Sequence, residues 1–250
     1  MPFNFGIDSV AAVTNTSALR AHGVEFSVRY ISAPGNSKNI TRTEAETIRR
    51  GGLDVVLVWE GAGTEPLAGK NQGTQDARLA KAEAEAVGAP PHSPIYFALD
   101  QDPNGLSAAQ WAEIDAYFKA VAAVIGHKCV GAYGGYAFIK HLFDKKLITY
   151  GWQTYGWSNG RWDIRAQLRQ YLNAQVIAGM NVDFDHATHA DYGQWGGANT
   201  PGKVDLWGVE YRNELGRIQH RNTKHPRGWA LRYAKPFQHG AVTFRPLHRK

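Results

Sequence analysis

The sequence has a single cysteine, Cys129, among its 250 residues. One cysteine excludes an intramolecular disulfide and a cysteine-rich metal site. Because Cys129 stands in the apolar run CVGAY of residues 129–133, we expect a buried and unreactive thiol rather than a nucleophile.

Long apolar segments are also missing. No apolar run approaches the roughly 20 residues that a membrane-spanning helix requires, so we expect no membrane span. The amino terminus has no basic stretch followed by a long apolar segment, and we therefore expect no signal peptide. The protein is then expected to be made in the cytoplasm, and any action outside the cell needs another route.

Acidic residues are scarce near the C-terminus. Residues 196–250 contain 11 Lys and Arg but only 3 Asp and Glu, whereas residues 1–195 contain 17 and 19. We predict a folded domain over residues 1–195 and a basic, Gly/Arg/His-rich extension over residues 196–250. Only the extension could attract an anionic or protein partner, such as a virion or wall component. Nucleic acid is not favoured as a partner. The simplest interpretation is a solvated, weakly ordered segment.

Helix and strand patterns alternate along the first two thirds of the chain, which predicts a parallel α/β sheet. Thr41 with Glu44 and Ser107 with Gln110 have the spacing of capping boxes. The expected helices lie near residues 16–22, 41–50, 72–87, 107–125 and 136–143, and the expected strands near 5–8, 25–31, 54–60, 95–100, 129–133, 147–152 and 167–171.

Carboxylates follow several of the predicted strands. The apolar run of residues 95–99 ends at Asp100 and Asp102, and two other strands end at Asp8 and Glu60. Acidic side chains at the carboxyl ends of neighbouring parallel strands are typical of the active site of a (β/α) barrel. A doubly wound nucleotide-binding sheet is disfavoured, because no Gly-x-Gly-x-x-Gly follows the first strand. We therefore predict a TIM-like barrel.

Several motifs occur in a characteristic order. They are Phe5-Gly6-Ile7-Asp8, Val28-Arg29-Tyr30-Ile31, Lys38, Ile95-Tyr96-Phe97-Ala98-Leu99-Asp100, Gly131-Ala132-Tyr133-Gly134 and Trp152-Gln153-Thr154-Tyr155-Gly156-Trp157-Ser158. Over roughly residues 3–195 the chain resembles a glycoside-hydrolase-like TIM-barrel family, formerly a domain of unknown function, common in actinobacteria and their phages. That family is distantly related to the glycoside hydrolase family 25 lysozymes, which cleave the glycan chain of peptidoglycan.

The resemblance implies a set of catalytic carboxylates. Asp8 matches the first-strand aspartate of the lysozymes, and Asp183 matches their closing Val-Asp motif. Asp100 and Asp102 fall where the lysozymes have an Asp-x-Glu pair whose glutamate is the general acid. Asp102 is one methylene shorter than that glutamate, so Glu60 is a second candidate for the proton donor.

Each of these carboxylates also has a structural interpretation. Asp102 opens a good turn sequence, Asp-Pro-Asn-Gly, and Asp8 could cap the helix that follows it. Glu60 could instead form an ion pair with Arg29 or Lys70.

Aromatic residues are abundant, with eight Trp and eleven Tyr. Sugar-binding clefts use such rings as platforms, and Tyr30, Trp59, Tyr133, Trp152 and Trp157 are the candidates for binding substrate. Packing in the core is an equally good interpretation for any one of them.

The segment of residues 183–189, Asp-Phe-Asp-His-Ala-Thr-His, offers a weak metal interpretation. Its two His and two Asp could bind zinc or manganese, but spacing picks out no fourth ligand. We expect neither a metal nor another cofactor.

The preferred function is hydrolysis of glycosidic bonds in a bacterial cell-wall polysaccharide, with peptidoglycan the favoured substrate. A phage lysin or a tail-associated wall hydrolase would reach the wall without a signal peptide. The alternative is a catalytically inactive barrel that binds carbohydrate or has a structural part in a virion.

Overall fold

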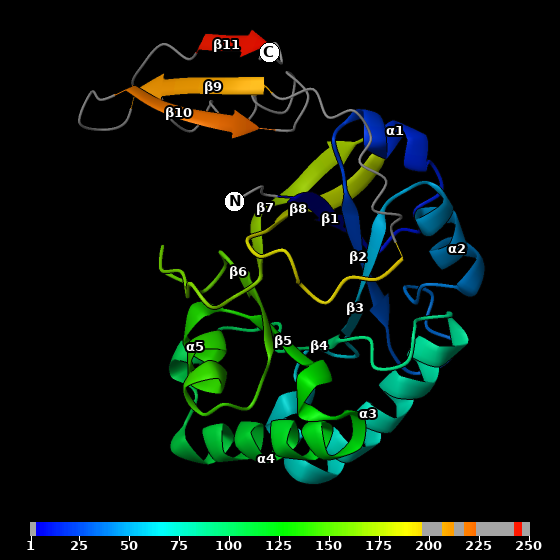
Figure 1. The fold of residues 1–250 in the computed structure, drawn as a ribbon. Coiled ribbons are helices and arrows are strands. Elements are labelled where there is room, and N and C mark those ends of the chain that lie inside the picture. The colour runs from blue at the N-terminus through cyan, green and yellow to red at the C-terminus, as the bar shows by residue number, and fades with distance from the viewer. Residues whose placement is uncertain (1–3, 197–206, 213–217, 224–242, 247–250) are drawn as a thin grey trace.

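The computed structural model describes residues 4–196, 207–212, 218–223 and 243–246. Eight strands close into one barrel in the order β1 to β8, and helices cover its outside (Figure 1). The strands of the barrel are β1 (Asn4–Asp8), β2 (Phe26–Ile31), β3 (Asp54–Trp59), β4 (Ile95–Ala98), β5 (Val130–Gly134), β6 (Tyr150–Thr154), β7 (Leu168–Ile177) and β8 (Met180–Ala187). The helices are α1 (Thr16–Ala21), α2 (Arg42–Arg50), α3 (Gly69–Ala86), α4 (Ala108–Ile125) and α5 (Tyr136–Asp144), with short 3-10 turns at Glu65–Ala68, Pro103–Gly105 and His127–Cys129.

The predicted TIM-like α/β barrel is confirmed, with one difference in strand direction. Strands β1 to β7 are each parallel to the next, whereas β8 is antiparallel to both β7 and β1. The reason is the connection: Ala178 and Gly179 have φ values of 51° and 79°, so β7 and β8 form a hairpin with a two-residue turn and no crossover helix. The expectation that every strand runs in one direction was therefore wrong for β8.

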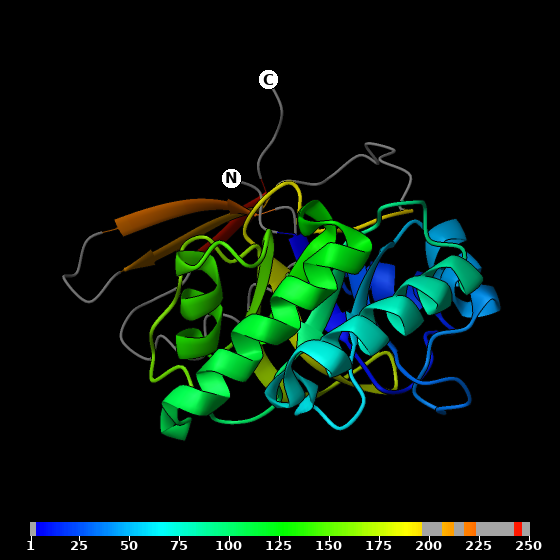
Figure 2. The same ribbon diagram turned by 90° about the horizontal axis from the view of Figure 1, so that it is seen from below.

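Apolar side chains form two layers because successive residues of a strand point to opposite faces. On β3, Val55, Leu57 and Trp59 belong to the outer layer between strands and helices, whereas Val56 and Val58 belong to the layer inside the barrel. Helices α3 and α4 pack against each other over the outer layer (Figure 2).

Both predicted helix starts are confirmed. Ser107 accepts a hydrogen bond from Gln110 N while the Gln110 side chain accepts from Ser107 N, which completes a capping box. The Thr41 side chain accepts from Glu44 N, but the Glu44 carboxylate turns away from the cap and binds Arg29.

The end of the barrel where the parallel strands begin is closed by aromatic side chains. Tyr192 is buried against Phe26, with the ring centroids 4.8 Å apart, and its carbonyl accepts a hydrogen bond from the Tyr96 hydroxyl at 2.8 Å. Cys129 is buried, as expected, and burial raises the pKa of its thiol. We call the opposite end, where the parallel strands finish, the mouth.

Three strands of the C-terminal extension are described. They are β9 (Trp207–Arg212), β10 (Ile218–Thr223) and β11 (Thr243–Pro246), and they form an antiparallel sheet in the order β10-β9-β11. The predicted division at 195/196 stays a prediction. Among the residues that the structure describes, no helix has the length and apolarity needed to cross a membrane.

Candidate active site

Asp8 ends β1 at the mouth of the barrel, with its side chain almost fully buried. Its Oδ1 accepts a hydrogen bond from the Tyr30 hydroxyl at 3.3 Å, and its Oδ2 accepts one from Gln170 Nε2 at 2.9 Å. These partners stand on β2 and β7, so the barrel's closure brings together groups that lie up to 162 residues apart in sequence.

Gln170 connects two carboxylates across the interior. Its Nε2 also donates to Asp183 Oδ2 at 3.2 Å, while its Oε1 accepts from the Tyr133 hydroxyl at 2.9 Å. Tyr133 stays protonated, because burial raises the pKa of its phenol well above the usual value. A phenol that donates to Oε1 fixes the orientation of the amide, so its N–H groups must face Asp8 and Asp183.

Asp183 and Asp185 stand two residues apart on β8 and share its inward face. Asp183 lies opposite Asp8 in the antiparallel ladder, and its Oδ1 accepts from Ala174 N at 2.8 Å. Ala174, with a φ of 55°, lies in an irregular part of the β7–β8 ladder. Asp185 lies deeper, fully buried, and its Oδ1 accepts from Trp152 Nε1 at 2.7 Å.

Glu60 follows β3 on the interior side. It forms an ion pair with Lys38 at 2.8 Å, and the Lys38 ammonium lies 5.0 Å from the centroid of the Tyr30 ring. The partners expected from sequence, Arg29 and Lys70, were wrong: Arg29 lies in the outer layer and binds Glu44.

Asp100 lies exposed at the mouth, two residues beyond the end of β4. Its backbone N–H donates to Gly63 O at 2.8 Å. Gly63 has a φ of 79°, and a Cβ there would lie 2.9 Å from Asp100 Cβ. A side chain at position 63 would therefore displace Asp100 as well as strain the backbone.

Asp102 has the turn contacts that its sequence context suggested. Its Oδ1 accepts from Asn104 N at 2.9 Å and from Asn104 Nδ2 at 2.6 Å, which caps the 3-10 turn that follows. Asp100 and Asp102 thus have different surroundings, although only one residue separates them.

Desolvation, nearly complete at Asp8 and partial at Glu60, Asp100 and Asp183, raises the pKa of these other predicted catalytic carboxyls. Desolvation, followed by the charge of Asp183, raises the pKa of Asp8 to about 6, against the hydrogen bond from Gln170. Desolvation also raises the pKa of Glu60, opposed by Lys38, and the pKa of Asp100 and Asp183. Carboxyls that hold protons closer to neutral pH are suited to general acid and base chemistry.

The predicted aromatic platforms separate into three groups. Tyr30 and Tyr133 reach the mouth and contact the carboxylate network. Trp152 is buried inside the barrel, and Trp157 lies half-buried in a loop with a φ of 55°. Trp59 has to be corrected: it points into the outer layer beneath the helices, because the alternation of β3 places it on the face opposite Glu60.

Three comparisons with known proteins concern the family and the fold of the chain. A family model described as the Rv2525c-like, glycoside hydrolase-like domain matches residues 17–214. The chain belongs to this family. Rv2525c of Mycobacterium tuberculosis, named as a candidate peptidoglycan hydrolase, is 30% identical over 201 residues, which are 76% of this chain and 82% of the relative.

Solved structures extend the likeness. The crystal structure of the Tat-secreted Rv2525c with L-tartrate aligns with a TM-score of 0.69 and 28% identity over 77% of this chain and 98% of that one. The catalytic domain of endolysin ply40 from Listeria monocytogenes bacteriophage P40 aligns with a TM-score of 0.53 and 20% identity, over 76% and 95% of the two chains. The autolysin LytC of Streptococcus pneumoniae aligns with a TM-score of 0.52 and 13% identity, over 74% and 46%. The last two show the fold alone.

Three polar residues of this Rv2525c-like barrel were not assigned to the site from sequence: Lys38, Gln170 and Asp185. The alternation of residues 183 and 185 on one strand was a usable signal for Asp185, since a carboxylate two residues from another shares its face. Lys38 was among the residues that support the resemblance, but it and Gln170 received no role, because their roles depend on partners from other strands.

The metal interpretation of residues 183–189 does not gain support from their placement. His186 points to the outer face of β8, where its ring lies 5.2 Å from that of Tyr171, whereas Asp183 and Asp185 point inward. Across the described ranges, no three His, Cys, Asp or Glu side chains are grouped so that they could hold a metal ion.

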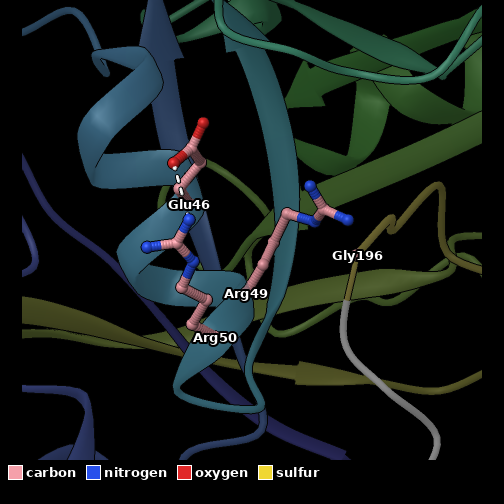
Figure 3. A pocket seen from close by; sticks show the side chains of 4 residues that line it. All are labelled: Glu46, Arg49, Arg50 and Gly196. Atoms are coloured by element: carbon pink, nitrogen blue, oxygen red, sulfur yellow. Dashed lines mark hydrogen bonds and ion pairs between the residues drawn. The ribbon is translucent and has the colours of Figure 1, made fainter.

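A hollow of about 330 Å³ lies away from the mouth (Figure 3). Glu46, Arg49, Arg50 and Gly196 line it. Gly196 follows Trp195, whose backbone pairs with Val55 near the start of β3, whereas Glu60 follows the end of that strand. The hollow is therefore on the opposite side of the barrel from the carboxylates.

Lys38→Met is expected to raise the pKa of Glu60 further, because the substitution removes the cation that opposes desolvation. If Glu60 titration limits turnover, the pH–rate profile of the variant should shift to higher pH on the limb that reports Glu60. A profile on peptidoglycan beside that of Lys70→Met, a substitution of an exposed lysine, checks this. Equal profiles would contradict an electrostatic role for Lys38.

Proposed function

We propose that this protein hydrolyses glycosidic bonds of peptidoglycan at the bacterial cell wall. One observation carries the proposal: Asp8, Glu60, Asp100 and Asp183 come from four strands or strand ends and meet at one mouth. Glycoside hydrolysis requires a pair of carboxyl groups on the two sides of the scissile bond, one protonated and one ionised.

Membership of the Rv2525c-like family supports the substrate class, because Rv2525c is named as a candidate peptidoglycan hydrolase. The fold shared with a phage endolysin and an autolysin agrees with this choice. We further propose that the protein reaches the wall as a phage lysin or as part of a virion tail, with the basic extension contacting other wall or virion components.

In the proposed mechanism Glu60 protonates the leaving oxygen. The interior position and raised pKa of Glu60 suit a general acid. The Asp102 side chain is shorter than a glutamate and is held in its turn by Asn104. Asp100 orients the reacting group, while Asp8 and Asp183 form the floor and stabilise positive charge that develops at the anomeric carbon. Where the sugar has an N-acetyl group, its amide could act as the nucleophile.

The second candidate function is a barrel that binds wall carbohydrate without turnover. One observation favours it: the side chain at position 102 is shorter than a glutamate and is held in a turn. Such a protein would keep the mouth as a binding site.

The test is incubation of the purified protein with peptidoglycan and measurement of new reducing ends. We expect wild type to release them steadily, and Glu60→Gln to release them at least about tenfold more slowly, because a glutamine cannot supply a proton. Binding of the wall without release would select the second function. Undiminished release by Glu60→Gln would show that another group is the acid.

A further inference from the structure

We infer that Asp185 is a neutral carboxylic acid that donates a hydrogen bond to Asp8 and keeps Asp8 ionised and oriented toward the mouth. Asp185 is thus a positioning residue. The protonation of the two carboxyls follows from their contacts and burial, while the catalytic use of Asp8 rests on the proposed function.

The contacts of Asp185 leave one oxygen without a donor. Oδ1 accepts from Trp152 Nε1 at 2.7 Å. Oδ2 is buried, and in the described part of the chain no amide, hydroxyl or amine donates to it. The Asp8 carboxyl, on the neighbouring strand β1, is in hydrogen-bonding contact with the Asp185 side chain.

Two ionised carboxylates are both acceptors and cannot form a hydrogen bond with each other. A buried contact between them therefore requires one proton. Left unprotonated, the pair would place two negative charges side by side in a site of low polarity, which is strongly unfavourable.

The other partners decide which carboxyl holds the proton. Asp8 accepts from two donors, Tyr30 and Gln170, which stabilise its ionised form. Asp185 accepts from Trp152 alone and is completely buried. The better-solvated charge is the one on Asp8, so the proton resides on Asp185 Oδ2 and is donated to Asp8.

The titratable groups around the pair act in the same direction. Tyr30, Tyr133 and Tyr96 face it from β2, β5 and β4, and Asp183 faces it from β8. Burial, followed by the charge of Asp8, raises the pKa of Asp185 well above the usual value. No Lys, Arg or His among the described residues forms an ion pair with either carboxyl. Lys38, which lies beside the Tyr30 ring, is bound to Glu60.

With this donor in place, Asp8 accepts three hydrogen bonds, from Tyr30, Gln170 and Asp185. A carboxylate held in this way is suited to stabilise positive charge or to accept a hydrogen bond from a sugar hydroxyl. It is poorly suited to supply a proton, which agrees with the assignment of that role to Glu60.

Infrared spectroscopy of the full chain at neutral pH provides the test. We expect wild type to show the carbonyl band of a buried protonated carboxylic acid. Asp185→Asn should lose the band, because its amide can still donate to Asp8 and accept from Trp152 but has no acid proton. Asp102→Asn, which replaces an exposed turn aspartate, should keep it. Absence of the band in wild type, or its survival in Asp185→Asn, would overturn the inference.

A second measurement begins with wild type, so its first outcome does not require a folded variant. An acid whose folded pKa is raised binds more protons in the native state than in the unfolded state, so stability falls as pH rises from about 4 through the folded pKa. Each such group lowers the folding equilibrium constant about tenfold per pH unit in that window. Above pH 7, where Asp8 with its pKa of about 6 is largely ionised, wild type should still lose stability with rising pH.

Denaturant unfolding between pH 7 and 8 measures this slope. The slope of the unfolding free energy against pH should correspond to about one proton fewer in Asp185→Asn than in wild type. Equal slopes in the two proteins would contradict the proposal. Because neither readout involves turnover, a protein that fails to release reducing ends can still confirm the protonated Asp185. An active enzyme whose spectrum lacks the band would support the proposed function and contradict the protonated Asp185.

Discussion

Asp100→Asn is expected to lower the release of reducing ends from peptidoglycan by at least about 100-fold, whereas Asp102→Asn is expected to change it by less than about threefold. The two aspartates are separated by one residue and receive the same chemical change. The contrast therefore tests the structural assignment of the two positions rather than the effect of removing a charge near the mouth.

The expectation follows from what each carboxyl contacts. Asp100 lies at the mouth, where partial desolvation raises the pKa of its carboxyl and its charge acts on Glu60 and Asp183. Asp102 binds Asn104 and caps a turn. An asparagine at 102 can keep these contacts through its Oδ1, so the turn should persist. An asparagine at 100 loses the negative charge that the reaction needs.

The measurement is the initial rate of reducing-end release at saturating peptidoglycan, with far-ultraviolet circular dichroism to show that both variants fold. If Asp102→Asn lost the larger share of activity, the general acid would be Asp102, and the turn would have to open on binding substrate. If both variants kept the wild-type rate, the catalytic carboxylates would lie elsewhere.

Arg29→Met is expected to lower the free energy of unfolding by about 3–5 kcal/mol. Arg29 is 1% exposed, and its Nε donates to Glu44 Oε1 at 2.6 Å. Removal of the guanidinium leaves the Glu44 carboxylate buried without its counter-ion, and that loss is the main source of the destabilisation.

The same ion pair also anchors the loop that follows Asp8. Arg29 Nη1 donates to Ser9 O, and Glu44 Oε1 accepts from Val13 N at 2.8 Å. Both contacts lie within five residues of Asp8. Loss of the pair should therefore loosen the loop beside the mouth as well as weaken the outer layer.

Urea unfolding at neutral pH measures the effect, and Arg50→Met is the matched control. Arg50 is 82% exposed and pairs with Glu46 on the same helix, a surface interaction whose loss should cost no more than about 0.5 kcal/mol. Similar midpoints for the two variants would show that the Arg29–Glu44 pair is replaceable and that the loop is held by other contacts.

Local sequence patterns predicted the elements of the barrel well. The capping box at Ser107 and the apolar face of α4, with Ile114, Phe118 and Val121 buried, depend on spacing within one helix. Carboxylates at strand ends predicted the mouth, because parallel strands in one sheet end on the same side. Strand β8 was the exception. A hairpin after β7 makes β8 antiparallel and a crossover helix would make it parallel, and the sequence around 178–179 indicates the two-residue turn only weakly.

The candidate site was predicted in its acids and missed in the groups that control them. Asp8, Glu60 and Asp183 were identified from their positions at strand ends or from the resemblance to lysozymes. For Asp102 and Trp59 the outcome depended on the direction of the side chain. Alternation along β3 places Trp59 on the outer face, and Asp102 binds Asn104 in the turn that follows Asp100. Lys38 was one of the residues that support the resemblance, but neither Lys38 nor Gln170 received a role, because their partners come from other strands.

The sequence by itself determined the strands, the helices and the placement of acidic residues where strands end, since these depend on propensity, periodicity and capping over a few neighbouring residues. Tertiary structure alone decided which acid faces which. Barrel closure sets Asp8 opposite Asp183 and beside Asp185. It also brings Gln170 of β7 within hydrogen-bonding distance of Asp8 and removes water from the pair of Asp8 and Asp185. Protonation depends on that exclusion of water and on charges brought close through space, which no local stretch of sequence contains.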